Sequence, residues 1–195
     1  MSITILPAVE PTEMQRFIVA KSNQFILHSR YDLSLMEQRI LACMISMVDS
    51  RGSDLQDCEL DIDTFCTLCK IEKRGSARYL KEVTKGLRDQ SFWMETEEGV
   101  YETFSWVEKI SINEKKGKIT LRFSNDMKPF LLNLQSDFTS YKLPMVLRFS
   151  SRYTNIVFDL IYSKFGQNGR KSGSLEILVD EMKERVQIKK DKRTN

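Results

Sequence analysis

The periodicity of this sequence changes close to residue 90, and this change constrains the fold more than any other feature. From Ser76 to Arg88, apolar residues recur at helical spacing, which predicts an amphipathic helix with Ser76 as its N-cap. From Phe92 to Phe123, apolar and polar side chains alternate instead, as they do in half-buried strands. The glycine-containing segments EEG and NEKKGK interrupt the alternation where tight turns are expected. The sequence therefore predicts a helix that runs directly into an antiparallel β-meander.

Two helices and a short strand are predicted before this point. Ser34 and Glu37 have the spacing of a capping box at the start of a long apolar run, which ends near Gly52. After a short extended segment, Asp61 or Asp63 can cap a brief second helix. The order helix, strand, helix, turn, helix and β-hairpin is typical of a winged helix-turn-helix, in which the hairpin forms the wing. The predicted fold class is therefore α+β.

The C-terminal part of the sequence indicates a partial second unit. A short helix with Pro129 in its first turn precedes a longer apolar helix, a loop with three glycines and a resumed helical pattern. This order resembles that of residues 34–69 in architecture, although not in sequence. We therefore divide the chain into a flexible N-terminal arm (1–20), a first winged-helix domain (21–140) and an incomplete second winged-helix domain with a basic tail (141–195).

The composition is that of a globular protein with one or two domains. Of the 195 residues, 41% are hydrophobic and 29% are charged. The formal net charge is only +3, so an acidic partner has to be bound by local clusters of basic residues. No apolar stretch is long enough to span a bilayer, and the N-terminus lacks the pattern of a secretory signal. We expect a cytoplasmic protein with no membrane partner.

One side of the helix predicted from Ser76 to Arg88 is basic. At helical spacing its four basic side chains fall within roughly 80° of one another. They are Arg78, Lys81, Lys85 and Arg88. The apolar residues are expected on the opposite side, and these are Tyr79, Leu80, Val83 and Leu87. Glu82 and Asp89 point away from the basic face, so it carries no acid of its own.

The predicted wing and the turn before this helix add further positive charge. A winged helix brings its last helix and its wing together, so we expect these charges to converge on one surface. This favours contact with double-stranded DNA over the alternative of an ordinary solvated helix face. The predicted DNA-binding residues are Arg74, Ser76, Arg78, Lys81, Lys85, Arg88, Lys115, Lys116 and Lys118. Lysines predominate, and a lysine is a flexible point charge, so mainly phosphate contacts with limited base reading are expected.

Other chemistry finds less support in the sequence. The four cysteines include a C-x-x-C motif at Cys66 and Cys69, whereas Cys43 and Cys58 stand apart from it and His28 is the single histidine. Reduced cysteines that pack helices explain this better than a zinc site or a thiol-dependent enzyme, although the enzyme remains an alternative. No G-x-x-x-x-G-K-[ST] phosphate loop occurs. We therefore predict neither catalysis nor a bound metal or cofactor.

Two stretches of the sequence resemble the iteron-binding plasmid replication initiator (Rep) proteins. The first has the K-x-N-x-x-I and L-S-L-x-E-Q-R motifs that are typical of the beginning of these proteins. Its matching residues are Lys21, Asn23, Ile26, Tyr31, Leu33, Ser34, Leu35, Glu37, Gln38, Arg39, Ile40 and Leu41. The second resembles the junction between their two winged-helix domains. Its matching residues are Lys128, Pro129, Phe130, Leu131, Leu132, Phe138, Thr139, Tyr141, Leu143, Ser151 and Tyr153.

The resemblance implies a replication initiator that binds directly repeated sites at a plasmid origin and recruits host replication proteins. In that family the first domain also supplies a homodimer interface, and dimers commonly repress the initiator's own gene. The second domain makes most of the contacts that recognise the DNA sequence. The likeness fades after Phe165, which implies either a shortened relative or a fragment. A winged-helix transcriptional regulator without an initiator role is the alternative function.

Overall fold

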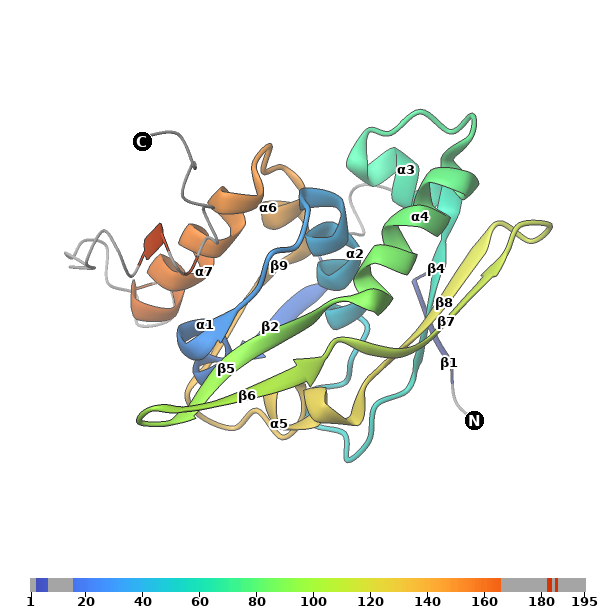
Figure 1. Ribbon diagram of the computed structural model, residues 1–195. Coiled ribbons are helices and arrows are strands. Elements are labelled where there is room, and N and C mark those ends of the chain that lie inside the picture. Colours follow the sequence, from blue (N-terminus) through green and yellow to red (C-terminus); the bar gives the residue numbers. More distant parts are fainter. Residues whose placement is uncertain (1–2, 7–15, 166–181, 184, 186–195) are drawn as a thin grey trace, which may run out of the picture.

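The central helix of the fold begins at the capping box that the sequence predicts. The computed structural model describes residues 3–6, 16–165, 182, 183 and 185 (Figure 1). In α2 (Leu35–Ile45), the hydroxyl of Ser34 accepts a hydrogen bond from the N–H of Glu37 at 3.3 Å, and the Glu37 carboxylate accepts one from the N–H of Ser34 at 2.7 Å. The helix then runs through the core, where Ile40 and Met44 are fully buried.

A helix-turn-helix follows α2. The carboxylate of Asp61 caps α3 (Ile62–Cys69) by accepting a hydrogen bond from the N–H of Thr64 at 2.7 Å. The turn ends at Gly75, whose φ of 78° is left-handed, and α4 (Ser76–Asp89) begins directly after it. The predicted N-cap at Ser76 is wrong by one position, because the left-handed residue occupies the cap and turns Ser76 into the core.

The wing belongs to a sheet that packs beside α4. Strand β8 (Lys118–Phe123) pairs antiparallel with both β4 (Asp57–Asp61) and β7 (Val107–Asn113), and β1 (Ile3–Leu6) adds a parallel edge to β4. The β7–β8 hairpin turns at Gly117, whose φ is 61°, and extends past α4 (Figure 1). This arrangement confirms an α+β winged helix with an antiparallel wing.

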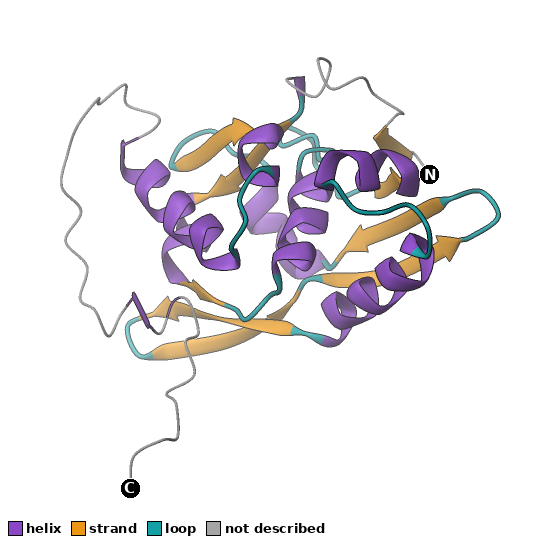
Figure 2. Ribbon diagram, turned by 90° about the horizontal axis from the view of Figure 1, so that it is seen from above, coloured by secondary structure: helices purple, strands orange, loops and turns teal. Residues whose placement is uncertain are grey.

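The predicted β-meander is wrong, because the strands form two hairpins in two different sheets. Strand β5 (Ser91–Glu97) pairs with β6 (Val100–Ser105) and with β3 (Ser29–Arg30), whereas β6 and β7 do not pair. Trp106 lies between them and is buried, with its ring 4.4 Å from that of Phe92. The two hairpins consequently extend toward opposite ends of the molecule (Figures 1 and 2).

The remaining elements close the core on the side away from the wing. They are β2 (Ile18–Ser22), α1 (Asn23–His28), η2 (Asn125–Met127), α5 (Lys128–Leu131), β9 (Phe138–Lys142), α6 (Leu143–Leu147) and α7 (Arg152–Phe165). Strands β2 and β9 form an antiparallel pair, and α7 packs against α1, α2 and β9. Pro129 lies in the first turn of α5, as the sequence predicts.

The buried residues form one continuous cluster on both sides of the proposed boundary at residue 141. Leu147 and Leu160 belong to the same cluster as Ile40 and Phe92. Within the proposed N-terminal arm, residues 3–6 form β1 and residues 18–20 belong to β2. The predicted glycine loop lies outside the described residues, and only Met182, Lys183 and Arg185 of the resumed helix are described, as helical. The division into domains stays a prediction.

Candidate nucleic-acid interface

Helix α4 rests on the core through one face and leaves its basic face in solvent. Leu80 and Leu87 are fully buried. Thr84 is also buried, and its hydroxyl is satisfied there because it donates to the carbonyl of Leu80 at 2.8 Å. The four basic residues predicted for the opposite face are all exposed, namely Arg78, Lys81, Lys85 and Arg88. Tyr79 was expected in the core but is 46% exposed, because α4 contacts the core through a stripe to one side of it.

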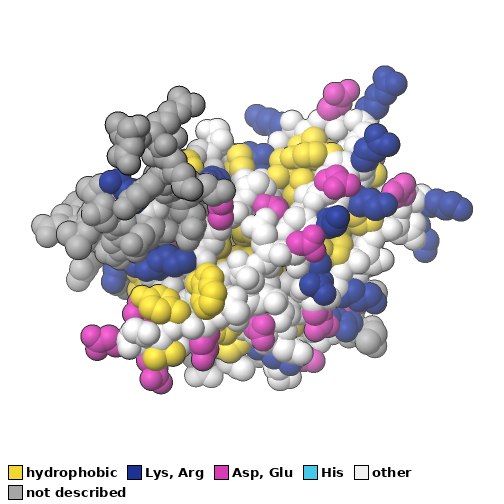
Figure 3. All heavy atoms as spheres, in the orientation of Figure 1, with side chains coloured by type: hydrophobic (Ala, Val, Ile, Leu, Met, Phe, Trp, Pro, Cys, Tyr) yellow, Lys and Arg dark blue, Asp and Glu magenta, His cyan; other side chains and the backbone are white. Residues whose placement is uncertain are grey.

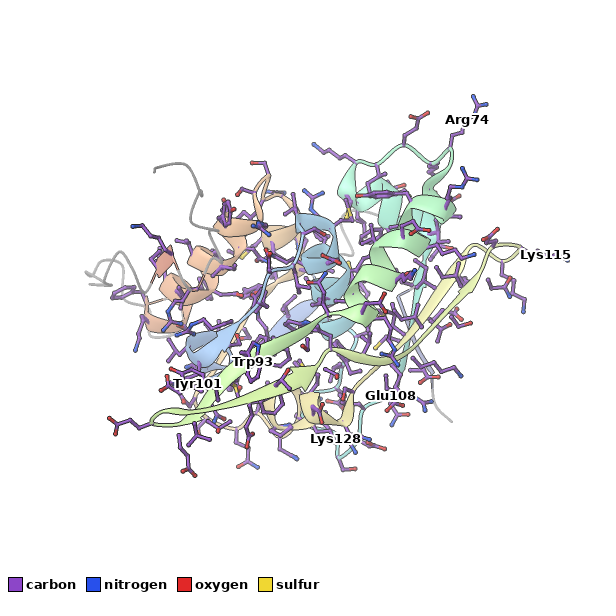
Figure 4. The ribbon with its side chains drawn as sticks, viewed as in Figure 1. Arg74, Trp93, Tyr101, Glu108, Lys115 and Lys128 are labelled. Carbon is purple, nitrogen blue, oxygen red and sulfur yellow. The ribbon has the colours of Figure 1, made fainter. Side chains whose placement is uncertain are left out.

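The turn before α4 carries exposed basic side chains to the end of the molecule. Arg74 extends into solvent from this turn (Figure 4). Lys73, beside it, lies 3.6 Å from the carboxylate of Asp63 on α3. Gly75, which has a left-handed backbone, follows Arg74 and directly precedes α4. The basic side chains of this turn are therefore adjacent to the first turn of α4.

The wing presents two of its three predicted lysines to solvent. Lys115 (Figure 4) and Lys116 are exposed in the turn of the wing, whereas the ammonium of Lys118 lies 3.7 Å from Glu59 and 3.6 Å from Asp61. Burial raises the pKa of Asp61, but the hydrogen bond from Thr64 and the charge of Lys118 outweigh it, and the net shift of this pKa is downward. Lys118 therefore holds the wing to β4.

Helix and wing meet, as the winged-helix pattern predicts. The ammonium of Lys81 on α4 lies 4.0 Å from the carboxylate of Glu114 at the wing. Between α4 and β7 there is a groove of about 500 Å³. It is lined by Lys81, Thr84, Lys85, Arg88, Glu108, Lys109, Ile110, Ile112 and Glu114. In the space-filling view, basic side chains gather over this end of the molecule with acidic ones among them (Figure 3).

The wing supplies acids and one cation that the sequence analysis missed. Glu82 and Asp89 on α4 are exposed beside the basic face, and Glu108 and Glu114 lie across the groove from it. Lys109 adds a further cation on β7. Glu114 stands next to the lysines in NEKKGK, so the sequence indicated an acid close to the basic wing tip. The position of Glu108 across the groove from α4 depends on how the strands pair, which the sequence did not show.

The structure therefore brings most of the predicted residues to one surface. We use the name basic surface for the exposed members of the predicted set, which are Arg74, Arg78, Lys81, Lys85, Arg88, Lys115 and Lys116. Ser76 is buried and Lys118 is held in ion pairs, so we do not include these two residues in the basic surface. Contact of this surface with DNA stays a prediction.

The cysteines lie in the core. All four are buried and none forms a disulfide, namely Cys43, Cys58, Cys66 and Cys69. Burial raises the pKa of Cys58 to about 12, and it also raises the pKa of Cys69 to about 12. Thiols in this state remain protonated at neutral pH, which argues against the thiol-dependent enzyme.

The described part of the chain has neither a cluster suited to a metal ion nor a helix suited to a membrane span. Among residues 3–6, 16–165, 182, 183 and 185, no three acidic, cysteine or histidine side chains cluster in a way that could hold a metal ion. None of the helices in those ranges combines the length and the apolar character that crossing a bilayer requires.

Comparison with known proteins gives consistent matches. The family profile described as "Initiator Replication protein, WH1" matches residues 18–162. A "Replication initiation protein" of Escherichia coli is 22% identical over 176 residues, which cover 87% of this chain and 54% of that protein. The chain thus spans about half the length of this curated relative.

Two solved structures are also similar. The Pi initiator protein in complex with iteron DNA superposes with a TM-score of 0.70 at 20% identity, over 93% of this chain and 77% of the other. The WH1 domain of the MSBI1.176 replication protein has a TM-score of 0.42 at 20% identity, over 50% of this chain and 77% of the other.

Proposed function

Because this chain belongs to the family of initiator replication proteins, we propose that it is a plasmid replication initiator that binds repeated sites in duplex DNA at the origin. In this role it takes part in replication initiation and in repression of its own gene. The Pi initiator, which shares the fold, is described in complex with iteron DNA, and this supports the same kind of ligand here. Because the target is plasmid DNA, we place the protein in the cytoplasm.

The convergence of α4 and the wing carries this proposal. Helix and wing are joined by the contact between Lys81 and Glu114, so the basic side chains of both elements can face one ligand. A duplex presents phosphates along its whole length, and lysine and arginine neutralise them without reading bases. The basic surface therefore has the shape and charge of a clamp on the DNA backbone.

The chemistry of the clamp indicates positioning more than base reading. Of the four basic side chains on α4, only Arg78 and Arg88 have the planar fork that matches guanine. If four or five phosphates are neutralised, the logarithm of the affinity falls with the logarithm of salt concentration at a slope of roughly −4.

The test is a binding measurement across salt concentrations with the charge-reversed variant Lys81→Glu/Lys85→Glu. The probes are the plasmid's own upstream DNA and a scrambled duplex of equal length. We expect weaker binding to both probes by about the same factor, and a shallower salt slope. Lys142→Glu/Lys164→Glu is the matched control, because it makes the same change in net charge on β9 and α7, away from α4.

Two results of this experiment would change the proposal. A loss confined to the plasmid's own site would show that α4 reads bases. Equal binding by the variant and the wild type would remove the basic surface from the interface and would leave the DNA-binding function without its structural support.

We further propose that the protein forms homodimers through the β5–β6 hairpin. Strand β6 is the edge of its sheet in the described residues, and such an edge can pair with a second copy. Trp93 and Tyr101 (Figure 4) and also Val100 are 54%, 58% and 45% exposed, so this hairpin presents apolar surface that a second copy can bury.

Sedimentation equilibrium tests the dimer. We expect Trp93→Lys/Tyr101→Lys to shift the wild-type dimer to monomer, whereas Ile161→Lys, which changes an equally exposed apolar residue on α7, should not. A monomeric wild type, or a double variant that remains dimeric, would exclude this hairpin as the interface.

Initiator and transcriptional regulator are distinguished in the cell. The gene and its upstream DNA are placed on a replicon that lacks an origin. We expect an initiator to sustain replication of this replicon and to recruit host replication proteins. Directly repeated sites beside the gene support the initiator, whereas repression from a single inverted repeat without replication supports the regulator.

A further inference from the structure

Gly86 lies in the interior of α4, where glycine is unfavourable. Glycine lowers helix formation about fivefold relative to alanine, because it loses more backbone freedom on folding. Gly86 has no left-handed backbone that would require glycine, in contrast to Gly75, Gly99 and Gly117. Its place on the helix therefore needs a reason outside the helix backbone.

The reason is the carboxylate of Glu37 on α2. A Cβ atom added at Gly86 would lie 2.6 Å from Oε1 of Glu37, closer than such atoms approach. The side chain of Glu37 is buried, at 6% exposure. The carboxylate thus occupies the space that any side chain at position 86 would need.

The carboxylate is held on both of its oxygens. Oε2 accepts the capping-box hydrogen bond from the N–H of Ser34 at 2.7 Å, and Oε1 accepts one from the amide of Gln90 at 3.0 Å. Glu37 is a flexible side chain in general, but here a shift costs two partly buried hydrogen bonds. It therefore acts as a fixed contact between α2 and α4.

We propose that Glu37 is a positioning residue for the DNA-binding helix. Its carboxylate contacts α4 at Gly86 and holds Gln90, which directly follows the last residue of the helix. These two contacts fix the distance and the rotation of α4 on α2, and with them the direction of the basic face. The contact itself is independent of the proposed function, whereas its consequence for DNA binding rests on that function.

A double-mutant cycle on unfolding tests the contact. In the wild-type background, Gly86→Ala is expected to lower the urea midpoint, because the new methyl group displaces the carboxylate. In the Glu37→Ala background the same substitution is expected to raise the midpoint, since only the roughly fivefold gain in helix formation remains. Glu37→Asp, which withdraws the carboxylate by one carbon, is the milder background if Glu37→Ala does not fold.

Two controls accompany the cycle. Glu37→Gln keeps the size of the side chain, so Gly86→Ala must still lower the midpoint in that background. Glu82→Ala removes an exposed carboxylate from α4 and is expected to leave the effect of Gly86→Ala unchanged. An effect of Gly86→Ala that is the same in the wild-type, Glu37→Ala and Glu37→Asp backgrounds would overturn the proposed contact.

DNA binding tests the positioning role. With a mixed-sequence duplex of about three helical turns, Gly86→Ala is expected to lower the affinity of the folded protein about tenfold and to reduce the salt slope by about one phosphate. Glu37→Ala, which removes the contact itself, is expected to lower both in the same direction, whereas Glu37→Gln, which keeps the size of the side chain, is expected to retain most of both. A merely structural role would change the folded fraction and leave the salt slope of the folded molecules untouched, and that result would overturn the proposal.

The contact between Glu37 and Gly86 and the DNA-binding function of the basic surface are independent of each other. If Lys81→Glu/Lys85→Glu binds this duplex as the wild type does, the proposed DNA-binding surface is wrong. The sign change in the unfolding cycle does not depend on that outcome.

Discussion

Gln38 and Arg39, two residues of the L-S-L-x-E-Q-R motif, join α2 to distant parts of the chain. The amide of Gln38 donates to the carbonyl of Leu33 at 3.0 Å and accepts from the side chain of Asn155 at 2.9 Å. The guanidinium of Arg39 donates to the carbonyl of Phe149 at 2.8 Å. Because buried polar groups need partners, these residues specify how α7 and the α6–α7 turn pack on α2.

The buried thiols predict how stability depends on pH. The pKa of Cys58 and of Cys69 is raised from 9.0 to about 12, mainly by burial, so the folded protein keeps both protons while the unfolded chain releases them. The stabilising effect is complete below about pH 9 and is lost as pH rises toward 12. We expect the unfolding constant to increase up to about tenfold per pH unit for each thiol above pH 9.

Urea unfolding between about pH 8 and pH 9.5 measures this dependence, because tyrosines of the unfolded chain, with an ordinary pKa of about 10, are still mostly protonated in this range. Cys58→Ala/Cys69→Ala is the matched variant and is expected to reduce the dependence to the part that remains from Cys43, whose pKa burial also raises. A wild-type midpoint that stays constant over this range would contradict the raised pKa values.

The three lysines of the wing have different roles, and this can be separated experimentally. Lys118→Ala is expected to lower the free energy of unfolding by about 0.5–1 kcal/mol, because the pairs with Glu59 and Asp61 are partly shielded from solvent. Lys115→Ala/Lys116→Ala is expected to leave the free energy of unfolding unchanged and to weaken DNA binding. Urea unfolding and DNA titration measure the two effects, and an exchange of these phenotypes would contradict the assignment.

At the scale of elements, helices were predictable where local chemistry determines them. The Ser34 capping box, the Asp61 cap and the basic face of α4 all follow from spacing within one turn or two. The break at Trp106 was not predictable in this way, because the alternation of apolar residues continues through it. Its burial against Phe92 depends on rings contributed by other elements, so the division into two hairpins is a tertiary effect.

In the candidate site, too, some features follow from local spacing in the sequence and others depend on tertiary packing. Exposure of the α4 cations followed from helical spacing, whereas the approach of Glu114 to Lys81 and the burial of Ser76 depend on how α4 packs. The two motifs of the family resemblance also meet only in three dimensions. Lys21 of the first lies opposite Thr139 of the second in the β2–β9 pair.

A buried ion pair joins α7 to β2, and its loss is expected to lower the free energy of unfolding. The ammonium of Lys21 on β2 lies 2.5 Å from the carboxylate of Asp159 on α7, which also accepts from the hydroxyl of Tyr141 at 2.7 Å. Lys21→Met leaves a buried carboxylate without its cation, so we expect a loss of about 3–5 kcal/mol in the free energy of unfolding. Lys21→Met/Asp159→Asn is expected to lose less, because no unpaired charge remains.

Chemical denaturation followed by circular dichroism measures these losses. The matched control is Arg152→Ala, which breaks the more exposed pair between Arg152 and Asp32 that also joins α7 to the N-terminal half of the fold. We expect a loss of less than about 1 kcal/mol there. A double variant at Lys21 and Asp159 that is less stable than Lys21→Met would contradict this account.

At the scale of the whole molecule, the elements after residue 140 belong to the same core as the winged helix. Six buried apolar side chains lie in this part of the described chain, and they are Tyr141, Leu143, Val146, Leu147, Ile156 and Leu160. At roughly 2 kcal/mol for each, their burial contributes about 12 kcal/mol before the entropy cost of ordering these residues is subtracted. Single domains have a total stability of only about 5–15 kcal/mol, so we expect the loss of these side chains to destabilise the winged helix.

This dependence gives a prediction about where the folded unit ends. A chain of residues 1–140 loses α6, α7 and the end of β9, and we expect it to be unfolded, with a collapsed NMR spectrum and no cooperative urea transition. A chain of residues 1–165 keeps every one of the six side chains and is expected to unfold in a single transition. If the shorter chain folds with a midpoint close to that of the longer one, the boundary at residue 141 is the correct one. If only the longer chain folds, α7 is part of the first winged-helix domain, and the pair between Lys21 and Asp159 is an internal contact of that domain.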